Sequence, residues 1–191
     1  MKIFRPILLG ICLLLSACMA DIPSRKLDVQ SFPLVNMTIV SETGKSLLAY
    51  GVGDKKHQLI DQAIFDNTVG IFNKNGVATT QIYVSGIDDI GNLAQFTKKT
   101  KTSHILMFKA SSIESTNYSP TFLVFDTSLI DVKSEKIVWK SSPKLFIACN
   151  KDCDFNIDVK HMLASVLKAL NKDGFITLKD NKIVDENNKE F

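Results

Sequence analysis

Apolar side chains recur at helical spacing in three segments: 54–73, a stretch after Asp88-Asp89, and 156–173. Gly76 and Gly174 lie just beyond the first and the last segment, where glycine commonly ends a helix. The residues expected to face the core are Ile60, Ala63, Ile64, Phe65, Val69, Ile71 and Phe72, then Ile90, Leu93 and Ala94, and finally Val159, Leu163, Val166, Leu167 and Leu170. The pattern therefore predicts amphipathic helices, each with one buried face.

Runs rich in β-branched and aromatic residues alternate with these helices and predict strands. They span residues 34–40, 46–50, 79–85, 104–110, 121–132 and 137–148. The polar segment 111–120 is expected to be a loop, and residues 133–136 a turn. The order ββαβαβββα predicts an α/β fold: a two-layer sandwich of one mixed, twisted sheet backed by about three helices, with parallel, right-handed strand–helix–strand units.

The last two strands carry apolar residues on both sides, although a sheet with one face in water alternates apolar and polar residues. Residues 122–125 read Phe-Leu-Val-Phe, and residues 145–148 read Leu-Phe-Ile-Ala. Either both faces are covered within the domain, or one is covered by a partner protein or a second copy. The candidate interaction surface comprises Phe122, Val124, Phe125, Trp139, Leu145 and Phe146.

The apolar run 7–15 follows Lys2 and Arg5 and is shorter than the roughly 20 residues that a membrane-spanning helix needs. This layout is typical of a secretory signal peptide, expected over residues 1–17. Leu15-Ser16-Ala17-Cys18 also resembles the lipobox of bacterial lipoproteins. The resemblance implies cleavage before Cys18 and acylation of Cys18, for example with palmitate. Two or more acyl chains hold a protein firmly to a membrane.

Met19 follows this cysteine, at the position where Asp retains enterobacterial lipoproteins in the inner membrane. By that analogy the protein is expected at the outer membrane, facing the periplasm or the cell surface. Residues 18–33 are polar and contain two prolines, and we expect them to form a tether. Residues 34–176 are expected to form one α/β domain, and the charged segment 177–191 a loose tail.

Charge is nearly balanced once the signal peptide is set aside. Lys2 and Arg5 belong to that peptide and count among 23 basic residues, against 20 acidic ones. A nucleic-acid-binding protein needs a strong basic excess on one face. The run 98–101, Lys-Lys-Thr-Lys, lies at the end of a predicted helix, where cations complement the helix dipole. We therefore expect no nucleic-acid partner.

Two cysteines, Cys149 and Cys153, remain after Cys12 in the signal peptide and the lipidated Cys18 are set aside. In an oxidising envelope, such a pair is expected to form a disulfide. A redox pair would have two intervening residues rather than three. A zinc site would need more ligands, and only His161 lies nearby in the sequence.

No catalytic or cofactor motif occurs in the chain. His57, His104 and His161 are expected to be surface or boundary residues rather than catalysts. The acidic pairs Asp88-Asp89 and Asp152-Asp154 each precede a helix, where capping explains them. We therefore expect no enzymatic activity, no cofactor and no metal.

The segment 128–142, SLIDVKSEKIVWKSS, resembles a hairpin in the small α/β domain of a group of envelope proteins. This group includes the penicillin-binding-protein activator LpoB, the curli-secretion lipoprotein and the amino-terminal domain of TolB. The amphipathic helix 158–170 follows the hairpin, as it does there. The resemblance implies a role in secretion, in assembly of surface structures or in cell-wall synthesis. The synthase activators have a long arm, whereas this tether is short, so docking near the outer membrane fits the chain better.

Taken together, the anchor and the two-sided apolar hairpin predict a non-enzymatic binding or assembly module for another envelope component. Self-association is a second form of the same hypothesis. Two alternatives remain open: an envelope hydrolase that uses carboxylates not identifiable from sequence, and a carrier of a small ligand in a cavity between sheet and helices.

Overall fold

The computed structural model describes residues 22–27, 34, 36–42, 54–83, 90–116, 119–148, 154–185 and 187–191. The expected lipobox Leu15-Ser16-Ala17-Cys18, the Cys149–Cys153 disulfide and the strand 46–50 lie outside the described residues, as does the side chain of His57.

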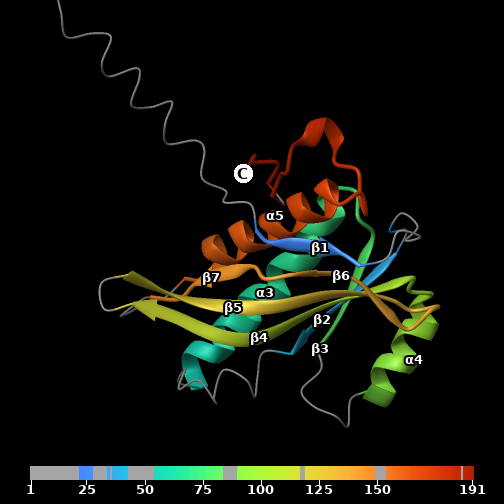
Figure 1. Ribbon diagram of the computed structural model, residues 1–191, viewed down its shortest axis with the longest axis horizontal. Coiled ribbons are helices and arrows are strands. Elements are labelled where there is room, and N and C mark those ends of the chain that lie inside the picture. The colour runs from blue at the N-terminus through green and yellow to red at the C-terminus, as the bar shows by residue number, and fades with distance from the viewer. Residues whose placement is uncertain are drawn as a thin grey trace, which may run out of the picture.

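Seven strands form one mixed sheet, in the order β1-β6-β5-β4-β2-β3, with β7 paired to β5 (Figure 1). β2 is parallel to β3 and β4, and the other pairs are antiparallel. The bounds are β1 Ser24–Lys26, β2 Met37–Glu42, β3 Thr79–Tyr83, β4 His104–Thr116, β5 Ser119–Asp131, β6 Lys136–Ser141 and β7 Lys144–Phe146. The predicted α/β fold with one mixed sheet is confirmed.

Two long helices pack side by side against one face of the sheet (Figure 1). They are α3, Asp54–Lys74, and α5, Asn156–Lys172, and Asn67 Nδ2 of α3 donates to Asn156 Oδ1 of α5 at 2.8 Å. Gly76 and Gly174, with φ of +81° and +79°, follow the two helices as expected. All five apolar positions predicted for the last helix are buried. In α3 the buried stripe is narrower than expected, because Phe65 is 43% exposed.

The third helix, α4 (Ile90–Thr100), lies apart from these two (Figure 1). β3 and β4 flank β2 on opposite sides, so the connection through α3 and the connection through α4 run in opposite directions across the sheet. Right-handed crossovers then place α3 and α4 on opposite faces. Thr102, just after α4, bonds through its hydroxyl to Thr38 of β2 at 2.6 Å. Ala94 is exposed rather than facing inward.

The core lies between the sheet and the pair α3–α5. Alternate residues of β5 point toward the helices, and Leu123, Phe125 and Leu129 are 0% exposed. Phe108 of β4 meets Phe125 edge to face, with ring centroids 6.3 Å apart. Strand alternation places every second residue of β4 and β5 on the opposite face, away from α3 and α5.

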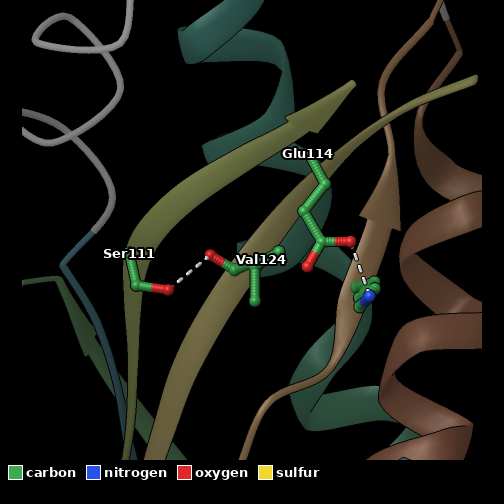
Figure 2. Close-up of polar contacts among 4 residues, drawn as sticks. Ser111, Glu114 and Val124 are labelled. Carbon is green, nitrogen blue, oxygen red and sulfur yellow. Dashed lines mark hydrogen bonds and ion pairs between the residues drawn. The ribbon is translucent and has the colours of Figure 1, made fainter. Parts of the chain in front are cut away.

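The segment 111–120, predicted to be a loop, instead belongs largely to strands. β4 continues to Thr116 and β5 begins at Ser119. Side chains support this extension: Ser111 Oγ donates to the Val124 carbonyl at 3.2 Å, and Lys144 Nζ contacts Glu114 Oε2 at 2.6 Å (Figure 2). Backbone pairing with an apolar strand therefore outweighs the polar composition of this segment.

The predicted strand 137–148 is divided into β6 and β7. Ser142 and Pro143 lie between the two, and proline has no N–H to donate to a strand ladder. The Pro143 carbonyl nevertheless accepts the Phe125 N–H at 3.0 Å, so the chain stays alongside β5.

Parts of the expected tether and tail are built into the domain. β1 lies within the tether segment and pairs antiparallel with β6. In the expected tail, Leu178 and Ile183 are buried. The Asn75 side chain binds Val184 twice, donating to its carbonyl at 2.7 Å and accepting its N–H at 3.0 Å. The loose-tail prediction is therefore wrong for the described residues, because these contacts close the end of the core.

One carboxylate joins both ends of the domain. Asp173, at the end of α5, accepts hydrogen bonds at one oxygen from Trp139 Nε1 and from Ser24 Oγ, each at 2.7 Å. Trp139 belongs to β6 and is fully buried, and Ser24 opens β1. The bond from the indole fixes α5 against β6, and the bond from the hydroxyl fixes β1 beside it.

We predict that Asp173→Ala lowers the free energy of unfolding by about 1–3 kcal/mol, because it leaves the buried indole N–H of Trp139 without an acceptor. Urea unfolding followed by Trp139 fluorescence measures the change. Asp66→Ala, at an exposed position of α3, is the matched control and should change the stability by no more than about 0.5 kcal/mol. Equal effects of the two substitutions would contradict the role of Asp173.

Candidate binding surface

The side of the sheet that faces away from α3 and α5 has a surface formed by four strands, β4, β5, β6 and β7, which we call the open face. Strand register places its residues in rows: Ile105 is opposite Ile130, Met107 opposite Ser128, and Lys109 opposite Asp126. The residues of the open face are Ile105, Met107 and Lys109 on β4, Phe122, Val124, Asp126, Ser128 and Ile130 on β5, Ile137 and Lys140 on β6, and Phe146 on β7.

The centre of the open face is polar and hollowed. A pocket of about 250 Å³ lies over β4, β5 and β6. It is lined by Met107, Lys109, Asp126, Thr127, Ser128, Lys140, Ser141 and Ser142. The lining therefore includes two lysines, one aspartate and three serines. Such a lining can bind an acidic or hydroxylated group by hydrogen bonds and charge attraction.

The two ends of the open face are apolar. At one end, Ile137 is 41% exposed and lies opposite Ile130. At the other end, the rings of Phe122 and Phe146 meet edge to face, with centroids 5.6 Å apart. Both rings are half-buried. Glu114 lies opposite Phe122 and pairs with Lys144 (Figure 2). The open face thus has apolar contact area at its two ends and charged side chains at its centre.

The predicted interaction surface is corrected by these positions. Phe125, Trp139 and Leu145 are 0% exposed and point into the core beneath α3 and α5. Only Phe122, Val124 and Phe146 lie on the open face, and Val124 is 8% exposed. The reason is strand alternation: in an apolar run, successive residues point to opposite faces, so one run supplies both the core and the surface.

Several residues of the open face were not predicted as site residues. Lys109, Asp126 and Lys140 are isolated charges within strands, and their spacing in the sequence matches no known motif. The available signal was alternation: a charged residue at every second position beside apolar neighbours marks the solvent-facing side of a strand. Sequence alone does not give the register that gathers these three residues around one pocket.

His104, at the start of β4, is buried and lies beside Ser103 and opposite Asp131. Its Nδ1 is 3.0 Å from Ser103 Oγ, and Ser103 Oγ in turn donates to the Asn36 carbonyl at 2.6 Å. Because the serine proton is used in that bond, Nδ1–H donates to the serine and cannot act as its base. The arrangement contains the residue types of a catalytic triad but lacks its hydrogen-bond direction.

Asp131 is engaged by the turn that follows it. Its carboxylate accepts a bond from Ser134 Oγ at 2.6 Å and bonds from the backbone N–H groups of Lys133 and Ser134 at 3.2 Å each. The Ser134 hydroxyl, together with these N–H groups, lowers the pKa of Asp131. Asp131 therefore stabilises the β5–β6 turn.

Burial lowers the pKa of His104 from its ordinary value of 6.5, although the charge of Asp131 opposes the shift. In the unfolded chain His104 takes up a proton as the pH falls through about 6.5, whereas the folded protein does not until a lower pH. The free energy of unfolding should therefore decrease between pH 7.5 and 5.5.

His104→Gln should make that decrease smaller. Thermal unfolding at both pH values measures it, and His161→Gln, at an exposed position of α5, is the control that should retain the wild-type difference. If the free energy of unfolding of the His104→Gln protein decreased between these pH values as much as that of the wild type, the lowered pKa of His104 would not be the cause of the decrease.

The remaining candidates for chemistry are limited. Within the described ranges, no group of three His, Cys, Asp or Glu side chains is placed to hold a metal ion. His161 is exposed, and its ring meets Phe191 at 5.5 Å. Asp126 is the one carboxylate among the residues that line the pocket, whereas glycoside hydrolysis commonly uses two.

None of the helices in the described part is long and apolar enough to span a bilayer.

Neither a protein-family model nor a curated protein matches the chain. Solved structures with a similar arrangement include the PelC dodecamer from Paraburkholderia phytofirmans, with a TM-score of 0.45 and 8% identity over 75% of this chain and 94% of that chain. A Xanthomonas campestris protein of family DUF330 has a TM-score of 0.39 and 10% identity over 81% and 91% of the two chains. Lipoprotein GNA1162 from Neisseria meningitidis has a TM-score of 0.33 and 10% identity over 73% and 96%. Likeness at these TM-scores transfers neither a function nor a partner to this chain.

Proposed function

We propose that this chain is a lipid-anchored envelope protein that binds another envelope protein through the open face of its sheet and catalyses no reaction. The lipobox-like sequence ending at Cys18 supports the anchor, which we place at the outer membrane. The observation that carries the binding role is the open face itself: α3 and α5 lie on the other side, and α4, on this side, packs against β3 and contributes no residue to the charged pocket.

The chemistry of the open face indicates the kind of partner it fits. Its centre has Lys109 and Lys140 but only one acid, Asp126, so it favours a partner with acidic groups at the centre of its own surface. The apolar ends, around Ile137 and around Phe122, would contact apolar side chains on each side of those acidic groups. We therefore expect the partner protein to present a surface on which acidic groups lie between two apolar patches.

A second copy is a poorer match for the same surface. In a two-fold symmetric dimer the same patch meets itself, so two centres that each have two lysines and one aspartate would face each other with a net positive charge on both sides. Like charges across an interface disfavour association. The open face is therefore assigned to a different protein.

A photo-crosslinking residue placed at Ser128, in the centre of the open face, tests this assignment in intact cells. We expect an adduct with one distinct protein, and no such adduct from a crosslinker at Lys168, which is exposed on α5. Lys109→Glu should reduce the adduct at least about tenfold, because charge reversal opposes the acidic partner. Lys74→Glu, at the end of α3, is the matched control and should leave the adduct unchanged.

Three results would contradict this function. They are an adduct only between two copies of the chain, the same adduct from both crosslinker positions, and an adduct that Lys109→Glu leaves unchanged. Circular dichroism of each variant shows that the fold is retained.

A further inference from the structure

The start of the folded domain lies very close to the expected lipid anchor. β1 begins at Ser24, six positions after Cys18. A fully extended chain covers at most about 3.6 Å per residue, so Ser24 is no more than about 22 Å from Cys18. Among the described strands, β1 is an outer strand of the sheet and pairs with β6 alone. Lipidation of Cys18 would therefore hold this edge of the sheet near the membrane surface.

The same edge is basic. Arg25, Lys26 and Lys140 are all exposed, and Leu27, the next residue along, is 43% exposed. We call these four residues the basic edge. Arg25 lies directly opposite Lys140 on the neighbouring strand, where like charges repel each other. No ion pair joins either of them to an acid in the part of the chain that the structure describes. An anion between them would relieve the repulsion.

One acid of the described residues that contacts β1 is already engaged. Asp173 accepts bonds from Ser24 and Trp139, as described above. Lys26 extends along the helix side of the sheet, and its Nζ lies 5.1 Å from the centre of the Phe175 ring. Its side chain is nevertheless exposed to solvent. Positive charge therefore remains on both sides of β1.

We propose that the basic edge docks on the membrane and that Arg25, Lys26 and Lys140 bind the phosphate groups of anionic phospholipids. The inference rests on the proposed lipid anchor at Cys18. Arg25 and Lys26 point to opposite faces of the sheet, so only an edge-on approach brings both to the headgroups. Leu27 then lies at the level of the headgroups, where an apolar side chain can insert. In this orientation the sheet stands away from the bilayer, so Lys109 and Asp126 of the open face stay accessible to a protein partner while Lys140 contacts the headgroups.

Acetylation of lysines by a membrane-impermeant reagent tests the docking on the lipidated protein. The protein is incorporated into vesicles of phosphatidylglycerol or of phosphatidylcholine, and the labelling rate of each lysine is measured by mass spectrometry. Each basic residue near an anionic surface strengthens binding about fivefold, so Lys26 and Lys140 should label several-fold more slowly in phosphatidylglycerol. Lys74, on α3, should label at the same rate in both. The protection should disappear at high salt, which screens surface charge.

Lys109 separates edge-on docking from docking of the whole open face. It lies two strands from Lys140, about 10 Å away along the sheet. Edge-on docking leaves Lys109 unprotected, whereas equal protection of Lys109 and Lys140 would overturn the proposed orientation. Arg25→Ala should reduce the protection of Lys140 about fivefold, and Lys74→Ala should have no effect.

Flotation of the vesicles distinguishes failure of this inference from failure of the anchor. Protein that does not float lacks the lipid, which contradicts the proposed function. Protein that floats but labels equally in both lipids retains its anchor and overturns the docking. Equal slowing of Lys140 by soluble glycerol phosphate, without vesicles, would instead assign the site to a free phosphate and would also overturn it.

Discussion

The structure depends on the hydrogen bonds that Asp173 accepts. This carboxylate ends α5, and it receives a buried indole N–H from β6 and a hydroxyl from β1. Three elements far apart in the sequence therefore meet at one oxygen. The bond to Ser24 has a functional consequence, because Ser24 is the first residue of the strand that follows the expected anchor. The same carboxylate that fixes the last helix also fixes the strand that follows the proposed anchor.

The sheet divides the molecule into two sides with different tasks. The side that packs against α3 and α5 contains the large apolar residues, including Trp139, Phe108 and Phe125, and supplies the burial that stabilises the fold. The open face has partly exposed apolar groups at its ends and charges at its centre. β1 and its basic residues lie at the edge between the two sides, and Lys140, which lies opposite Arg25 and also lines the pocket, is the residue that the proposed membrane docking and the proposed protein binding share.

Sequence predicted the fold well where a single periodicity decides the structure. The stripe from Val159 to Leu170 fixed the last helix, and the glycines beyond α3 and α5 marked their ends. β1 could not be predicted, since Ser-Arg-Lys has no strand signal and becomes a strand only through pairing with β6. The site was predicted only in part. An apolar run shows that a strand is buried, but register and bulges decide which of its residues face outward, and the irregularity after Leu129 changes that pattern along β6.

The account depends most on the lipid at Cys18, and intact-mass spectrometry of the protein purified from its native membrane tests it most directly. The account predicts a chain that begins at Cys18 and carries the added mass of a diacylglyceryl group, with or without a third acyl chain. A chain that retains residues 1–17, or that begins elsewhere with an unmodified thiol at Cys18, would contradict it.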